Sequence, residues 1–242
     1  MHESLQIIVL NTIKHKESGF IIQAYSNNNG RENFFLKSPA KNNKSKPLAH
    51  FHPLAILDIT LSTFKLSQIP TIKEFSAAYR LASIRESVIK SSIALFMSDL
   101  IYKTFTEQEN NHELYGFLKE SIIELERLDN GISNYHLFFL YQVCKKLGYS
   151  PLVKKEAEPG MLFDIPSAGF LDFGVKGYHT FGEIESKILL FLEGCSIDTL
   201  PLLKISGNDR YIFIKMMLTF LTYHIGCEIR VNSLEILKEV FE

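Results

Sequence analysis

Residues Phe34–Pro53 read FFLKSPAKNNKSKPLAHFHP, a polar, proline-bounded segment that separates two apolar runs. The segment holds four lysines, and no acidic residue stands between Glu32 and Asp58. We predict an exposed basic loop that joins two strands of a packed scaffold. Lysines this close repel one another, and a multivalent anion such as a nucleic-acid backbone relieves that repulsion. On this segment alone, lysines that only keep a surface loop hydrated explain the pattern slightly better.

The runs around this loop have the pattern of short β-strands. Three precede the loop and two follow it, at Leu5–Ile13, Phe20–Tyr25, Arg31–Leu36, Leu57–Leu61 and Phe64–Glu74. The second and third are joined by Asn27–Gly30, which can supply the positive φ angles of a tight hairpin turn. Five short strands in this space predict an N-terminal five-stranded OB-fold barrel, although a sandwich fragment or an SH3-like barrel fits nearly as well.

From Tyr79 onward, apolar residues recur every three to four positions, which is typical of helices. Helices are expected at about residues 83–105, 114–125, 137–147, 182–192, 209–225 and from 232 onward. Prolines and glycines in the region of about 151–182 predict a small hairpin that pairs Met161–Ile165 with Phe170–Phe173. The predicted fold class is α+β, with a barrel domain at residues 1–80 and a C-terminal helical bundle at 81–242.

The net charge of −1 conceals a division along the chain. Residues 1–80 carry a net charge of +5, so the remaining 162 residues carry −6. A basic first third and an acidic remainder predict two domains with different partners. Three widely spaced cysteines, Cys144, Cys195 and Cys227, favour a reducing cytoplasm over a disulfide framework. We expect neither a signal peptide nor a membrane-spanning segment.

A search for enzyme motifs finds no phosphate-cradling loop, dinucleotide fingerprint, nucleophile elbow or metalloprotease helix. His50 and His52 are a metal-like pair, but no Asp, Glu or Cys stands within a few residues of them. Contact with phosphate, or with solvent, is the better explanation for both. We therefore assign no catalytic residue, no metal and no cofactor. A hydrolase built across a domain cleft around Cys195 or Cys227 stays open as an alternative.

The basic residues of the first domain are the functional signal of the sequence. The predicted nucleic-acid-binding residues are Lys14, Lys16, Arg31, Lys37, Lys41, Lys44 and Lys46. If the barrel closes, the groups of the first turn and of the long loop could converge on one face. Phe34, Phe35 or Phe51 could then stack on bases, although whichever of Phe34 and Phe35 points inward belongs to the core.

Four segments together resemble one bacterial family. They are IIVLNTIKHKESGFIIQAYSNNNGR at residues 7–31, LKSPAKNNKSKPLAHFHPLAILDITL at 36–61, LFFLYQVCKKLGYSP at 137–151 and TYHIGCEIRVNSLEIL at 222–237. Their order and spacing resemble the recombination mediator family RecO over essentially the whole chain. Within them, Glu17-Ser18, Leu147-Gly148-Tyr149 and Tyr223-His224 correspond to recurrent family motifs.

The resemblance implies an OB barrel followed by a helical bundle. It also implies binding of single- and double-stranded DNA, annealing of complementary strands, and help for RecA on DNA coated by single-strand-binding protein, together with RecR. The partners would be both forms of DNA, RecR, the tail of single-strand-binding protein and, indirectly, RecA. The location would be the cytoplasm, in association with the nucleoid, and no membrane would be involved.

Two departures from the family pattern stand out. Many members carry a four-cysteine zinc site after the Leu-Gly-Tyr helix, whereas residues 152–173 hold no cysteine here. A small β-hairpin in place of a zinc finger is therefore expected, held by apolar contacts around residues 163–171. Members also often have arginine where this chain has Leu137, so the contact with the acidic tail of single-strand-binding protein is in question; Lys145 and Lys146 lie nearby.

The leading hypothesis is a non-enzymatic DNA repair mediator whose barrel grips phosphates and whose acidic helical domain serves protein partners. The first alternative is an adaptor that uses the basic loop to bind an acidic protein. Substitution of the lysines separates the two, because an adaptor would show no DNA binding that depends on them.

Overall fold

The computed structural model describes residues 4–15, 18–38, 47–62, 69–151, 160–175 and 177–241. The chain packs as two compact units, Met1–Arg127 and Leu128–Glu242. The predicted boundary near residue 80 lies inside the first unit, between its last strand and its first helix. Whether residues 1–80 fold as an independent domain stays a prediction.

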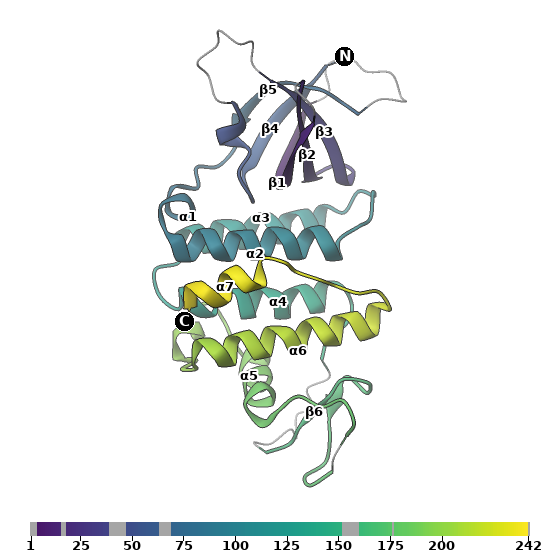
Figure 1. Ribbon diagram of the computed structural model, residues 1–242, viewed down its shortest axis with the longest axis vertical. Coiled ribbons are helices and arrows are strands. Elements are labelled where there is room, and N and C mark those ends of the chain that lie inside the picture. Colours follow the sequence, from purple (N-terminus) through teal and green to yellow (C-terminus); the bar gives the residue numbers. More distant parts are fainter. Residues whose placement is uncertain are drawn as a thin grey trace. The chain divides into compact units, whose positions relative to one another are not determined.

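The first unit begins with a five-stranded antiparallel sheet (Figure 1). Its strands are β1 (Ser4–His15), β2 (Gly19–Ser26), β3 (Gly30–Lys37), β4 (Ile56–Leu61) and β5 (Ile72–Ala77). The order across the sheet is β3-β2-β1-β4-β5, and one isolated parallel bridge between Phe35 and Thr71 links the two edge strands. The expected OB arrangement is confirmed, but the ladder does not close into a complete barrel.

The strand positions agree with the sequence pattern except at the fifth. β5 begins at Ile72, eight residues later than expected, and residues 63–68 lie outside the described part of the chain. Between β2 and β3, residues 27–29 form the predicted tight turn, and Gly30 has a positive φ of 70°. Only glycine adopts this conformation without steric cost.

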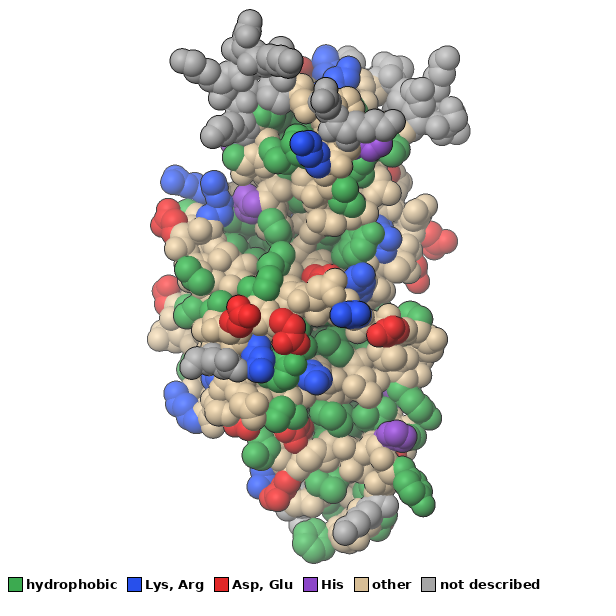
Figure 2. All heavy atoms as spheres, viewed as in Figure 1, with side chains coloured by type: hydrophobic (Ala, Val, Ile, Leu, Met, Phe, Trp, Pro, Cys, Tyr) green, Lys and Arg blue, Asp and Glu red, His purple; other side chains and the backbone are tan. Residues whose placement is uncertain are grey.

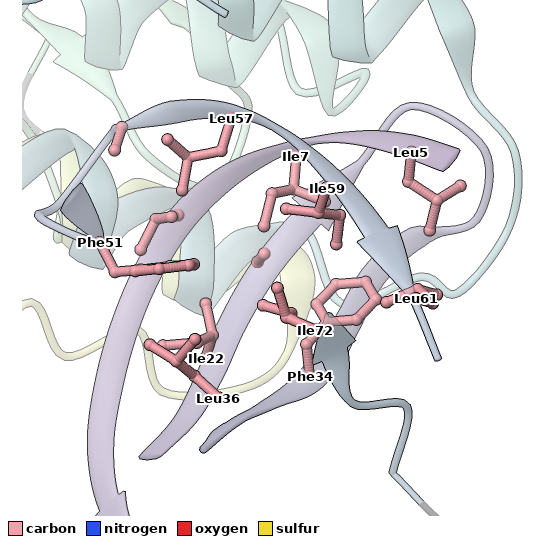
Figure 3. Packing of buried hydrophobic residues seen from close by; sticks show 13 residues of the cluster. Leu5, Ile7, Ile22, Phe34, Leu36, Phe51, Leu57, Ile59, Leu61 and Ile72 are labelled. Atoms are coloured by element: carbon pink, nitrogen blue, oxygen red, sulfur yellow. The ribbon is translucent and has the colours of Figure 1, made fainter. Parts of the chain in front are cut away.

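The concave side of the sheet encloses an apolar core (Figure 3). Alternate residues of the strands point into it, as the twofold period of a strand requires. The larger members are Leu5, Ile7, Ile22, Phe34, Leu36, Phe51, Leu57, Ile59, Leu61 and Ile72. Phe51 comes from the long connection after β3, so the loop is fastened to the core at its second end.

Three helices complete the first unit: α1 (Ala82–Glu86), α2 (Val88–Thr104) and α3 (His112–Arg127). The single helix expected at 83–105 is wrong, because the backbone at Ser87 is extended. The Ser87 side chain accepts a hydrogen bond from the Lys90 N–H and so caps the start of α2. The Ser98 hydroxyl of α2 donates to the Leu10 carbonyl of β1, which fixes this helix against the sheet.

The second unit is helical, with the predicted elements slightly shifted. Its helices are α4 (Tyr135–Lys146), α5 (Glu183–Glu193), α6 (Gly207–Ile225) and α7 (Leu234–Phe241), joined by the short 3-10 helices η2 (Ile132–Asn134) and η3 (Leu200–Leu202). A capping box between Ser206 and Asp209 starts α6, and Gly226 ends it with a φ of 77°. No helix of the described residues has the length and apolarity that crossing a membrane requires.

The predicted hairpin is present as β6 (Phe163–Asp164) and β7 (Gly169–Phe170). Aromatic rings hold it: the Phe163 ring centroid lies 5.4 Å from that of Phe170, 4.9 Å from that of Phe181 and 5.6 Å from that of Phe220 on α6. The described residues contain no group of three or more His, Cys, Asp or Glu placed to hold a metal ion. Apolar packing therefore fastens this hairpin to the helices of its own unit.

Candidate nucleic-acid interface

Two predicted cations lie at the same end of the sheet. Lys14 on β1 is paired with Phe20 on β2, and the neighbouring Gly19 is paired with Lys37 on β3. Both lysines are exposed, and β2 separates their strands, so their backbones lie about 10 Å apart. Because adjacent rows of a sheet face opposite sides, Lys14 and Lys37 leave opposite faces of this sheet end. The two lysines therefore lie at the same end of the sheet, but not on the single face that was expected.

Both ends of the lysine-rich connection are attached at this sheet end. At its start, the Ser38 N–H donates to the Ser18 carbonyl over 3.0 Å. At its return, η1 (Pro47–His50) leads to Phe51, whose carbonyl accepts a 3.2 Å hydrogen bond from the Thr12 hydroxyl of β1. The described residues on either side of positions 39–46 are therefore anchored near Lys14 and Lys37. Four of the predicted binding residues, Lys16, Lys41, Lys44 and Lys46, lie outside the described residues.

Local sequence explains how the return is held. A register irregularity between Val9 and Asn11 interrupts the regular pairing of β1 with β2. Next to it, the Val9 N–H donates to the Ala55 carbonyl, and the Leu54 N–H donates to the Val9 carbonyl. Leu54 itself has a positive φ of 62°, which turns the chain into β4. Backbone hydrogen bonds, rather than side-chain charges, therefore fix the position at which the chain returns to the sheet before β4.

Arg31 lies at the other end of β3 and is engaged there. Its guanidinium carbon lies 4.3 Å from the centroid of the Tyr102 ring, and its Nη1 donates a 2.9 Å hydrogen bond to the Tyr102 carbonyl near the end of α2. Its backbone N–H donates to the Glu107 carbonyl over 3.0 Å. The structure thus does not bring Arg31 together with Lys14 and Lys37, and its contact with DNA stays a prediction.

Of the three phenylalanines considered for base stacking, two are core residues. Phe34 is fully buried and Phe51 is 3% exposed, so neither ring is available. Phe35 points away from the core, is half-buried, and its ring lies edge-on to His15 at 6.1 Å between centroids. The expectation that one of Phe34 and Phe35 belongs to the core is confirmed for Phe34. Phe35 remains the candidate for stacking.

Two of the three cysteines lack the setting of a nucleophile. Cys144 is fully buried, and burial raises the pKa of its thiol far above the ordinary range. Burial also raises the pKa of Cys195, whose sulfur contacts the Ser196 carbonyl and the Thr199 hydroxyl. A reactive thiolate requires a lowered pKa and a basic neighbour. Cys227 is exposed at the end of α6. The hydrolase alternative has no support in these contacts.

The family's arginine position in α4 faces the core here. Leu137 is fully buried, so a charged side chain would not fit in its place without rearrangement. Of the two neighbouring lysines, Lys145 lies 3.8 Å from the Glu193 carboxylate of α5 and 5.5 Å from the centre of the Tyr141 ring. The Tyr141 hydroxyl donates to the same carboxylate. Lys145 is therefore tied to an acidic partner within its own unit.

Comparison with known proteins identifies the family of the chain. Residues 1–79 match the family model described as Recombination protein O N terminal, and residues 85–233 match Recombination protein O C terminal. The DNA repair protein RecO of Flavobacterium psychrophilum is 28% identical over 242 residues, with both chains covered completely. Its counterpart from Phocaeicola vulgatus is 28% identical over 235 residues, 97% of each chain. This chain belongs to the RecO family of DNA repair proteins.

Proposed function

We propose that this protein is a non-enzymatic DNA repair mediator. It binds single- and double-stranded DNA, anneals complementary strands and, together with RecR, helps to load RecA onto DNA coated by single-strand-binding protein. The observation that carries the proposal is the basic sheet end: Lys14 and Lys37 are exposed there, and Ser38 and Phe51, on either side of the lysine-rich sequence 39–46, are hydrogen-bonded to the same sheet end. Membership of the RecO family supports the same proposal.

Annealing by such a surface needs no covalent chemistry. Two complementary strands repel each other through their phosphates, and cations that neutralise both backbones remove that barrier. Lys14 and Lys37 leave opposite faces of one sheet end, so this end could touch two strands at once. The acidic remainder of the chain would serve the protein partners, RecR and the tail of single-strand-binding protein, in the cytoplasm near the nucleoid.

The test is fluorescence anisotropy of a labelled single-stranded oligonucleotide across a salt series. Wild type is compared with Lys41→Glu/Lys44→Glu/Lys46→Glu and with Lys14→Gln/Lys37→Gln. Each lost phosphate contact should reduce the slope of log K against log salt by roughly 0.7. We expect a steep wild-type slope that falls by about two units in the triple variant and by about 1.4 in the double variant.

The matched control is Lys204→Gln/Arg230→Gln, which removes two exposed charges from the second unit. Its slope should equal that of wild type. A strand-annealing assay with two complementary labelled oligonucleotides then checks whether the lysine variants lose annealing in step with binding. Wild type that fails to bind DNA at low salt would overturn the proposal and favour the adaptor, in which the basic loop binds an acidic protein.

A further inference from the structure

A pocket of about 530 Å³ lies where β4 begins, β5 ends and α1 follows, within the first unit. Four nitrogen-bearing side chains line it: His50 and His52 from the return of the basic connection, and Arg80 and Arg85 from the segment that leads into and through α1. Tyr79 and Glu86 are also on its wall. Figure 2 shows Lys and Arg side chains gathered beside a histidine in this part of the molecule.

The charges of the pocket are unbalanced. Arg80 and Arg85 are both exposed, and within the described residues neither guanidinium forms an ion pair or a hydrogen bond. Glu86 is the one carboxylate among the lining side chains. Two unpaired arginines facing one hollow lower the energy of an anion placed there, and arginine is well suited to phosphate because its planar fork donates two hydrogen bonds.

His52 adds an adjustable donor. Its Nδ1 lies 3.1 Å from the Pro53 carbonyl oxygen, which can only accept, so Nδ1 carries a proton. In the neutral ring, Nε2 then carries none. Burial lowers the pKa of His52, the bond to Pro53 raises it, and the positive charges of Arg85 and His50 lower it. A bound anion would offset that positive charge, so Nε2 could take up a proton from solvent and donate to the anion.

The histidines of the pocket belong to the segment that is hydrogen-bonded to β1 near the basic sheet end. Phe51 lies between His50 and His52 in the sequence, and its carbonyl accepts the hydrogen bond of the Thr12 hydroxyl. Lys14 is two residues further along β1, a step of about 7 Å. A nucleic-acid strand bound at the sheet end would therefore pass close to the two histidines. Each nucleotide of that nucleic-acid strand supplies one phosphate.

We propose that this pocket binds a phosphate of a nucleic-acid strand as that strand passes from the basic sheet end toward α1, with Arg80, Arg85 and His52 as its donors. The inference rests on the proposed DNA binding and extends it to a site that the loop lysines do not form. Free inorganic phosphate carries the same chemistry, so the test separates the two sources.

The test compares wild type with Arg80→Gln/Arg85→Gln in the anisotropy titration of a single-stranded oligonucleotide across a salt series. The loss of two contacts should reduce the slope by about 1.4, while binding through the loop persists. Lys204→Gln/Arg230→Gln removes the same charge from the second unit and should keep the wild-type slope. Because both arginines are exposed and unpaired, the melting temperature of the double variant should match that of wild type.

A second series replaces chloride by inorganic phosphate at constant ionic strength. If the pocket holds a phosphate of the strand, inorganic phosphate should weaken oligonucleotide binding only slightly in wild type at matched charge screening, and less still in the arginine variant, which lacks two of the pocket's donors. Strong competition in wild type alone, with no difference in slope, would overturn the inference in favour of a small-anion site. An unchanged slope in the arginine variant would overturn it and leave DNA binding by the loop intact. Wild type that binds no oligonucleotide would remove both proposals.

Discussion

Arg31 shows that the charge of a side chain alone does not predict what that side chain contacts. In the sequence it is one more cation of a basic domain, and it was predicted to touch DNA with the lysines. In the structure its guanidinium covers the Tyr102 ring and donates to the Tyr102 carbonyl near the end of α2. Such contacts are made in space by residues 71 positions apart, so no local pattern signals them.

His136 on α4 carries a residue-scale prediction about pH. Burial, with the charge of Arg210 as a smaller cause, lowers the pKa of His136 from 6.5 to about 3. The unfolded chain therefore binds a proton below pH 6.5 that the folded chain does not bind, and the free energy of unfolding falls as the pH decreases. Between pH 7 and pH 5, this residue alone should lower the free energy of unfolding by about 2 kcal/mol.

The measurement is urea unfolding of wild type and of His136→Gln at both pH values. Glutamine does not titrate, so the variant should lose about 2 kcal/mol less than wild type between pH 7 and pH 5. Other titrating groups are common to the two proteins and cancel in the comparison. An identical loss in both proteins would show that His136 takes up its proton in the folded state.

At the same scale, the candidate site could be predicted from the sequence only in part. The alternation of β3 was enough to expect that one of Phe34 and Phe35 is internal, and Phe34 is. The position of Lys14 and Lys37 at one sheet end depends on the register of three strands, which the sequence does not determine. Arg80 and Arg85 were not identified, because they meet His50 and His52 only after folding; the unexplained histidine pair was the available signal.

At the scale of elements, the turn between β2 and β3 is tied to the connection between α2 and α3. Gly30 has a φ of 70°, and a Cβ added there would lie 2.7 Å from the Glu107 carbonyl oxygen and 2.8 Å from that of Glu109. Gly30→Ala should therefore lower the free energy of unfolding of the first unit by about 1–3 kcal/mol. Thermal unfolding followed by circular dichroism measures the effect.

Gly116 is the matched control for this prediction. It lies inside α3, and a Cβ added there would meet no atom within 4 Å. Gly116→Ala should raise the free energy of unfolding by about 0.4–1 kcal/mol, because alanine loses less backbone entropy in a helix. Equal effects of the two substitutions would contradict the steric argument at Gly30.

Element boundaries show where sequence patterns are reliable. The long apolar periods of α3, α4 and α6 were placed within a few residues, since burial of one face dominates their formation. The interruption at Ser87 was missed because residues on both sides follow the same apolar spacing. It arises from a capping bond and from the Glu126 carboxylate, which accepts hydrogen bonds from the Ser83 and Ile84 N–H groups, each 2.8 Å long.

For the whole molecule, the order of strands and helices could be predicted from the sequence, whereas the helices that pack with the sheet could not. The change from strand to helix periods predicted a five-stranded β-domain followed by helices, and this order is observed. Yet α2 and α3 pack with the sheet: the Tyr115 hydroxyl and the Lys119 ammonium both donate to the Gln6 side chain, over 3.1 and 2.7 Å. Apolar periodicity identifies a helix, but it does not show which element packs against the apolar face of that helix.

These contacts predict how fragments of the chain behave. The fragment of residues 1–127 contains every element of the first unit and should unfold cooperatively, whereas residues 1–80 lack the helices that bond to β1. We expect a clearly lower melting temperature, or no cooperative transition, for the shorter fragment. Calorimetry of both fragments decides the point. Equal melting temperatures would place the domain boundary at residue 80, as the sequence suggested.

The aromatic attachment of the small hairpin has a consequence for temperature. Phe163, Phe170, Phe181 and Phe220 hold β6 and β7 by burial of apolar rings. The strength of apolar burial fades on cooling, whereas bonds between a metal and thiolates do not depend on water in that way. The attachment of this hairpin should therefore weaken as the temperature falls.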